Sequence, residues 1–65
     1  MFVIVNGEAL PLPDPSTLAE LLRALAPSAP FAVARNEEFI PRLHYEQCAI
    51  AEGDRIEIVH PTVGG

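Results

Sequence analysis

The chain of 65 residues is 49% apolar, with one cysteine, two histidines and a formal net charge of −5 from nine acidic and four basic residues. These numbers exclude an intramolecular disulfide and a four-ligand cysteine–histidine zinc site, and they favour one compact domain from a reducing compartment. Because the basic residues are few and not clustered, we expect no nucleic-acid partner and instead a protein partner with a basic docking surface.

The N-terminal segment predicts a β-hairpin. Residues 1–5 (MFVIV) are continuously apolar, as in a strand with neighbours on both sides. The run is too short for a signal peptide or a bilayer span, so we expect a cytoplasmic protein without a membrane partner. Asn6-Gly7 is a strong hairpin signal. The returning strand, residues 8–12 (EALPL), contains Pro11 and therefore belongs at a sheet edge.

The helix is the clearest predicted element. Thr17 is a good N-cap, and Glu20 three residues later completes a capping box. The apolar residues that follow recur with helical spacing and form one stripe: Leu18, Leu21, Leu22 and Leu25. Pro27 and Pro30 end the helix. On the one helix of a small domain, such a stripe indicates a core-facing surface.

Short segments follow the helix, each limited by a turn or a proline. They are a strand at 31–36 (FAVARN), a solvated turn at 37–38 (EE), a short extended piece at 39–42 (FIPR) limited by Pro41, and an irregular or single helical turn at 43–47 (LHYEQ). Residues 51–54 (AEGD) predict a further turn, in which Gly53 can adopt positive φ.

The last strand, residues 55–60 (RIEIVH), places Ile56 and Ile58 on one face and Glu57 and Val59 on the other. The element order predicts an α+β domain of β-grasp type, a mixed sheet of four or five strands with one main helix on one face. Because one helix covers only one face, we expect an open apolar surface beside Val59, of the kind that marks binding surfaces. This domain spans residues 1–60.

Residues 61–65 form a C-terminal tail, which we expect to be flexible. Gly64 and Gly65 have no side chains, so a terminal carboxylate could enter a channel only as wide as a backbone. A carboxylate must first be activated, for example as an acyl adenylate, and the chain has no glycine-rich phosphate loop or lysine to do this itself. A partner would therefore have to supply the activation. Taken alone, a terminal Gly-Gly is also compatible with a frayed, featureless end.

Two stretches, ARNEEFIPR and AEGDRIEIVHPTVGG, resemble the ThiS family of thiamin-biosynthesis sulfur carriers, which are ubiquitin-like β-grasp proteins. The resemblance runs from VNGE through TLAELLRAL to the end. Its more specific parts are Asn36, the Ile40-Pro41-Arg42 element, the Gly53-Asp54 turn and the Gly-Gly terminus. The Gly-Gly terminus is shared with ubiquitin and the molybdopterin-synthase small subunit, whereas the Ile-Pro-Arg element indicates the thiamin branch.

The resemblance implies a carrier and not an enzyme, with no bound cofactor. A ThiF-like, E1-like adenylyltransferase would adenylate the carboxylate of Gly65 with Mg-ATP. Sulfur from the persulfide of a cysteine desulfurase would displace AMP, and a ThiG-like thiazole synthase would accept the sulfur from the thiocarboxylate. Thr62, Val63 and Gly64 would thread into the partner.

Three residues are candidates for docking these partners. We expect Val59 to point outward, whereas Phe39 belongs either to the core or to the open apolar surface. Arg42 either pairs with a surface acid or contacts a partner, and its place in the Ile-Pro-Arg element favours the second interpretation. Other functions stay open: a sulfur carrier for tRNA thiolation or molybdopterin synthesis, a ubiquitin-like protein modifier, or a domain that only binds.

The remaining chemistry-bearing residues have plainer interpretations. Cys48 follows Glu46 and Gln47, an environment without the positive charge that activates a thiol, so we expect an incidental or buried cysteine. His44 stands four residues before Cys48, but two ligands do not make a metal site. We expect His44 and His60 to be surface or packing residues.

Overall fold

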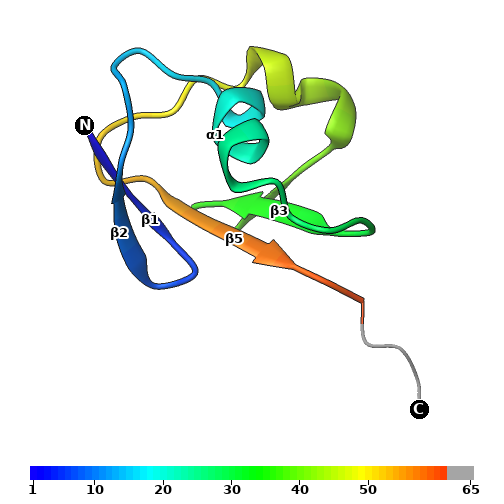
Figure 1. The fold of residues 1–65 in the computed structure, drawn as a ribbon. Coiled ribbons are helices and arrows are strands. Elements are labelled where there is room, and N and C mark those ends of the chain that lie inside the picture. The colour runs from blue at the N-terminus through cyan, green and yellow to red at the C-terminus, as the bar shows by residue number, and fades with distance from the viewer. Residues whose placement is uncertain (62–65) are drawn as a thin grey trace.

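The computed structural model describes residues 1–61, which form a five-stranded mixed sheet with one α-helix on one face (Figure 1). The elements in chain order are β1 (Phe2–Val5), β2 (Glu8–Pro11), α1 (Leu18–Leu25), β3 (Ala32–Arg35), β4 (Glu38–Ile40), the 3₁₀-helix η1 (Arg42–Gln47) and β5 (Arg55–Val59). The strand order is β2-β1-β5-β3-β4, with β1 and β5 parallel and the other neighbours antiparallel. The predicted mixed sheet with one main helix is confirmed.

The N-terminal hairpin forms as predicted. Asn6 and Gly7 both adopt positive φ, 47° and 87°, which is the requirement of the tight turn that matches strand twist. The turn sets Val5 opposite Glu8. β2 lies at the sheet edge, where the missing N–H of Pro11 is tolerated. β1 has neighbours on both sides, in keeping with its unbroken apolar sequence.

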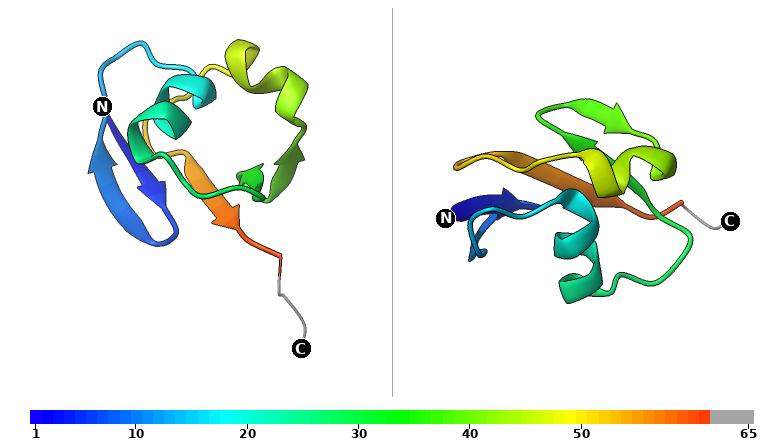
Figure 2. Two further views of the ribbon diagram at one scale, coloured as in Figure 1. Left: turned by 45° about the vertical axis from the view of Figure 1, so that its right-hand side comes forward. Right: turned by 90° about the horizontal axis from the view of Figure 1, so that it is seen from above.

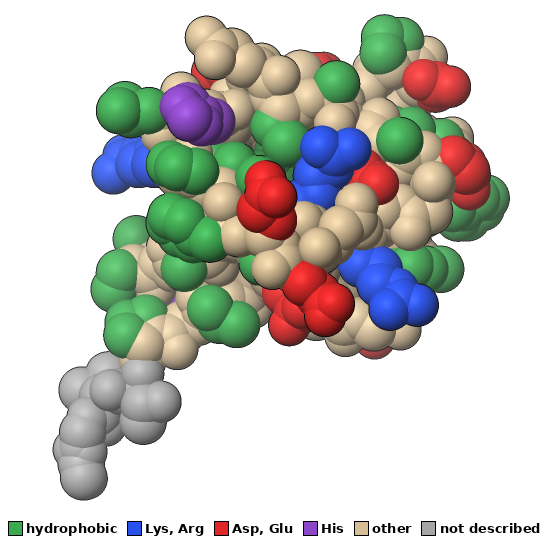
Figure 3. Space-filling view, turned by 180° about the vertical axis from the view of Figure 1, so that it is seen from behind, with side chains coloured by type: hydrophobic (Ala, Val, Ile, Leu, Met, Phe, Trp, Pro, Cys, Tyr) green, Lys and Arg blue, Asp and Glu red, His purple; other side chains and the backbone are tan. Residues whose placement is uncertain are grey.

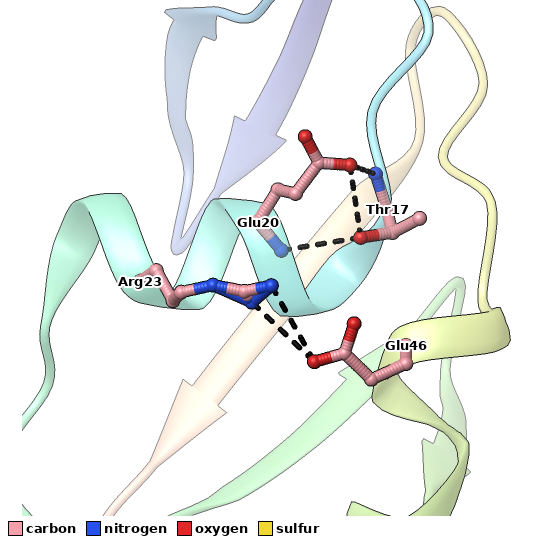
Figure 4. Close-up of polar contacts among 4 residues, drawn as sticks. All are labelled: Thr17, Glu20, Arg23 and Glu46. Carbon is pink, nitrogen blue, oxygen red and sulfur yellow. Dashed lines mark hydrogen bonds and ion pairs between the residues drawn. The ribbon is translucent and has the colours of Figure 1, made fainter.

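The capping box of α1 is also confirmed. The backbone N–H of Glu20 donates to Thr17 Oγ1 at 3.2 Å, and the N–H of Thr17 donates to Glu20 Oε1 at 3.0 Å (Figure 4). At the other end, Ala26 adopts a left-handed conformation and its N–H donates to the carbonyl of Leu22 at 2.8 Å. Both ends of the short helix therefore have partners for backbone groups that the helix itself leaves unpaired.

The core lies between α1 and the sheet face beneath it (Figure 2). Its buried side chains come from every layer of the fold: Val3, Val5, Leu18, Leu21, Leu22, Val33, Ile50, Ile56 and Ile58. β5 alternates as predicted, with its two isoleucines inside and its other side chains exposed. Leu25, in the last turn of α1, is 38% exposed. The predicted leucine stripe is thus buried except at its C-terminal end.

Several predicted boundaries were wrong. The strands predicted at 8–12 and 31–36 are β2 (Glu8–Pro11) and β3 (Ala32–Arg35), and the extended piece predicted at 39–42 ends at Ile40. The solvated turn is formed by Asn36 and Glu37, at φ 50° and 69°, and Glu38 already begins β4 opposite Arg35. Asparagine tolerates the left-handed region, and the Asn36 side chain is fixed by residues distant in sequence, so local pattern did not locate the turn. The last strand ends at Val59 and not at His60.

The segment predicted as irregular or as one helical turn is the 3₁₀-helix η1. It lies beside α1, and an ion pair between Arg23 and Glu46, 3.4 Å, joins the two helices (Figure 4). Within residues 1–61, no helix has both the length and the apolar composition needed to cross a membrane.

Candidate functional site

Among residues 1–61, no helix covers one of the two faces of the sheet. The side chains of this face alternate along each strand with those of the core and point away from α1. They are Phe2, Ile4, Ala9, Pro11, Ala32, Ala34, Phe39, Arg55, Glu57 and Val59, which we call the open sheet face. All of them are apolar except Arg55 and Glu57, so the apolar surface predicted beside Val59 is present.

Three large apolar side chains of the open sheet face are well exposed, whereas Ile4 is half-buried. Phe39 is 63% exposed, and Phe2 and Val59 are each 54% exposed. The structure thereby answers the open question about Phe39, which does not belong to the core. Phe2 is an addition to the candidates named from the sequence, and the unbroken apolar run of β1 is the signal that points to it. A group of exposed apolar side chains of this kind is typical of an interaction surface.

A shallow hollow lies on this face at the position where β1 has ended and β5 continues. β1 pairs with β5 only as far as Val5 opposite Ile56, whereas β5 continues to Val59. The Asn6 side chain occupies the gap: its Oδ1 accepts from the N–H of Ile58 at 2.9 Å, and its Nδ2 donates to the carbonyl of Ile58 at 3.2 Å. Asn6 and Val59 both line the hollow. Sequence reasoning identified Asn6 only as a turn residue.

Arg42 lies elsewhere. It begins η1 and lines a groove between α1 and η1 together with Leu22, Phe31 and Tyr45. The ion pairs found within residues 1–61 are Arg23–Glu46 and Arg35–Asp54, so the exposed Arg42 guanidinium does not pair with a surface acid of the described chain. The structure therefore brings two of the predicted docking residues, Phe39 and Val59, onto one face and places the third on the helix side.

A view from behind shows where apolar and charged side chains lie on this side of the molecule (Figure 3). Hydrophobic side chains gather along the border next to the point where the chain leaves the domain, while acidic and arginine side chains occupy the middle of this view (Figure 3). A partner that approaches the end of β5 therefore meets an apolar border first.

Asp54 directly precedes β5, at the end of the strand opposite to the point where the chain leaves the domain. It is 7% exposed, and its carboxylate accepts hydrogen bonds from Arg35 Nε (2.8 Å), the N–H of Ala51 (2.8 Å) and Asn36 Nδ2 (3.1 Å). Burial alone raises the pKa of Asp54, but these hydrogen bonds outweigh it and lower the pKa below the ordinary value of 3.8. The bond to Asp54 in turn raises the pKa of Arg35.

This network has a structural role. It ties the turn before β5 to the turn between β3 and β4, and Asn36 Oδ1 adds a bond from the N–H of Arg55 at 2.9 Å. Arg35 and Asn36 are separated from Asp54 by 19 and 18 positions in the chain, so no local spacing indicated these two partners. The specific Asn36 and Gly53-Asp54 motifs of the sequence thus meet at one place in the fold.

The environment expected for Cys48 was wrong in one respect: the thiol lies near the Arg35 guanidinium, so positive charge is present beside it. His44 and half-buried Cys48 line a shallow hollow on the η1 side. Among the described residues 1–61, no group of three or more His, Cys, Asp or Glu side chains is placed to hold a metal ion. His60 packs its ring against Phe31, with centroids 6.4 Å apart and planes inclined by 61°. Its predicted interpretation as a surface or packing residue is confirmed.

The predicted threading residues Thr62, Val63 and Gly64 and the predicted modification site Gly65 lie outside the described residues. What the structure describes is the exit from the domain. The chain leaves β5 at Val59 and continues through His60 and Pro61, both exposed.

Comparisons with known proteins agree with this geometry. The model of the ThiS family matches residues 3–65. A crystal structure of the thiamine biosynthesis protein ThiS from Geobacter metallireducens superposes with a TM-score of 0.87 at 26% identity and full coverage of both chains. The solution structure of a thiamine biosynthesis protein from the same organism gives 0.79 at 26% identity, covering all of this chain and 88% of the other. The predicted β-grasp fold is confirmed.

A curated relative is much longer. The thiazole synthase of Paramagnetospirillum magneticum (strain ATCC 700264 / AMB-1) is 38% identical over 66 residues, which cover all of this chain and 20% of that protein. The chain thus spans a fifth of the length of the relative it matches.

Proposed function

The chain belongs to the ThiS family, whose members are not catalysts, and we propose that it is a cytoplasmic sulfur carrier for thiazole formation in thiamin biosynthesis. The observation that carries the proposal is the family match over residues 3–65, which includes both the β-grasp domain and the Gly-Gly end. In this proposal residues 1–60 are the docking domain and residues 61–65 are the tail that other proteins act on.

The chemistry takes place at the carboxylate of Gly65. An E1-like, ThiF-like adenylyltransferase uses Mg-ATP to form the acyl adenylate, and pyrophosphate leaves. The outer sulfur of a cysteine-desulfurase persulfide then displaces AMP and forms an acyl disulfide. A second thiol attacks the cysteine sulfur of that acyl disulfide, which releases the thiocarboxylate and leaves a disulfide between the two thiols. The carrier itself holds no cofactor in this scheme, because ATP and magnesium are bound by the activating enzyme.

The proposed acceptor is a ThiG-like thiazole synthase. The support comes from the Paramagnetospirillum protein, in which a segment similar to this whole chain makes up a fifth of a protein named thiazole synthase. Joining a carrier domain to its acceptor raises the effective concentration of one for the other. This observation favours the thiazole branch over transfer of sulfur to tRNA or to molybdopterin, and over attachment to protein lysines.

The intact mass of the purified chain tests the carrier function. The chain is incubated with the adenylyltransferase, Mg-ATP and a persulfide donor. We expect a gain equal to sulfur replacing one oxygen, mapped to Gly65. Deleting Gly65, or adding one residue after it, should abolish the gain. The proposal would be refuted if the mass did not change with an adenylyltransferase that is active on the carrier of its own organism. Attachment to protein lysines would instead appear as conjugates of higher mass.

Docking is proposed to use the open sheet face. Phe39 and Val59 are exposed there on β4 and β5, and β5 leads into the tail. We expect Val59→Asp to raise the KM of the adenylyltransferase for the carrier about tenfold or more, since a buried charge opposite an apolar partner is costly. Because Val59 is exposed, the thermal midpoint should change little.

Arg42 provides the contrasting variant. It is exposed and without an acidic partner in the described chain, and it lies on the helix side of the molecule. Arg42→Gln keeps the stem of the side chain and removes the charge. If Arg42 contacts a carboxylate of the partner, the rise in KM should shrink as salt is added, whereas the effect of Val59→Asp should persist. An unchanged KM in both variants would remove both surfaces from the docking proposal.

A further inference from the structure

An aromatic contact continues the pairing of β3 and β5 beyond the last backbone pair. Ala32 lies opposite Val59 at the end of this antiparallel ladder. The next residues outward on the two strands are Phe31 and His60, and their rings meet edge to face with centroids 6.4 Å apart. Edge-to-face is a favoured arrangement of two such rings. The side chains therefore extend the ladder by one step, to the residue that precedes Pro61.

Phe31 connects this contact to the interior. It is half-buried and packs against the hydrophobic core, whereas His60 is exposed. His60 is thus held by a ring that is itself anchored on the core. Among residues 1–61, this ring contact lies one position beyond Ala32–Val59, the last backbone pair between β3 and β5.

Prolines flank both rings. Pro30 precedes Phe31 and Pro61 follows His60, and all four residues line one largely apolar hollow at the end of β5. A proline ring fixes φ near −65°, so the backbone has few directions available at either position. Ring contact and prolines together restrict how the chain leaves the domain.

We propose that Phe31 and His60 are positioning residues that set the direction in which the tail leaves β5 and so present it to the activating enzyme. The inference rests on the proposed carrier function. We assign them no chemical step; both lower the ordering cost that the enzyme must meet when it takes the tail into its active site. The ordering cost falls on binding, so loss of the ring contact should raise KM and leave kcat unchanged.

Steady-state kinetics test the consequence for the partner. Pyrophosphate release by the adenylyltransferase is measured against carrier concentration for the unaltered chain, His60→Ala and Phe31→Ala. We expect KM to rise between about twofold and tenfold in both variants, the range that corresponds to losing one edge-to-face pair. Phe31→Tyr and His60→Phe keep the rings and should restore KM. Leu43→Ala, which truncates a side chain that is 88% exposed, is the control and should match the unaltered chain.

A measurement without the enzyme keeps the two proposals separable. The ¹⁵N order parameter of the His60 amide should fall in Phe31→Ala while that of Val59, still paired with β3, is retained. An unchanged value at His60 overturns the positioning role, whatever the carrier assay gives. An unchanged KM in His60→Ala overturns it as well. If the unaltered chain is never thiocarboxylated by an enzyme active on its own carrier, the carrier function fails, whatever the order parameters show.

Discussion

The carboxylate of Asp54 connects the end of β3 and the turn after it to the turn before β5. Its oxygens accept hydrogen bonds from the Arg35 and Asn36 side chains and from the backbone of Ala51. These bonds are made to the charged form, so they outweigh the cost of burial and hold the pKa of Asp54 below 3.8. The residue type alone gives no hint of this, since an aspartate after glycine is equally typical of a solvated turn.

Replacing Asp54 by asparagine should therefore destabilise the domain by about 1–3 kcal/mol near pH 7, because Arg35 and the Ala51 N–H lose a charged acceptor. The lowered pKa means that the unfolded chain takes up the proton first. The contribution is complete above the unfolded value of 3.8 and is lost as the pH falls from there through the lower folded value.

Urea unfolding at several pH values checks the direction in which the contribution of Asp54 to stability changes with pH. The difference in unfolding free energy between the unaltered chain and Asp54→Asn should shrink on acidification below about pH 4. Glu57→Gln, which removes an exposed acid from the strand that follows Asp54, is the matched control and should change the unfolding free energy little. A difference that stays constant with pH would mean that the carboxylate charge does not contribute.

At the scale of the elements, α1 and the N-terminal hairpin follow from local signals. The capping box, the leucine spacing, Asn6-Gly7 and the edge position of Pro11 all act over a few residues, so sequence pattern predicts them correctly. The turn at Asn36–Glu37 and the side on which Arg42 lies depend on contacts between distant segments. Those features could not be derived from spacing, and the placement of the docking candidates was only partly predictable for the same reason.

Two contacts of α1, the Thr17 cap and the ion pair of Arg23 with Glu46, should contribute different amounts to stability. Thr17→Ala removes the side chain that accepts from the Glu20 N–H, and should lower stability by about 1 kcal/mol. Arg23→Ala breaks the ion pair with Glu46, whose side chains are 61% and 73% exposed, and should cost less than about 0.5 kcal/mol because solvent screens such pairs.

Thermal or urea unfolding of the two variants, with Thr17→Ser as the conservative control, checks this order. Serine keeps the hydroxyl acceptor and should retain most of the stability. If Arg23→Ala lowers stability more than Thr17→Ala does, the ion pair between α1 and η1 contributes more to stability than its solvent exposure indicates.

For the whole molecule, charge and apolar surface act on different steps of binding. The net charge of −5 acts at a distance, whereas the open sheet face acts only on contact. We expect the KM of the activating enzyme for the carrier to rise several-fold between about 50 mM and 500 mM salt, with kcat unchanged, because the screening length falls over this range. Sucrose, which leaves ionic strength constant, is the control for viscosity and water activity. A KM independent of salt would contradict an attraction between an acidic carrier and a basic partner.

The adjacency of β1 and β5 has a consequence for how the protein is made. The first and last strands of the domain lie side by side in the middle of the sheet, and β3 and β4 reach β1 only through β5. During synthesis, a nascent chain that has not yet released residues 55–59 from the ribosome lacks the strand that joins the two halves. The sheet can close only after almost the whole domain has emerged. Chains that terminate before β5 therefore cannot complete the sheet, and we expect cellular proteases to degrade them faster than the full domain.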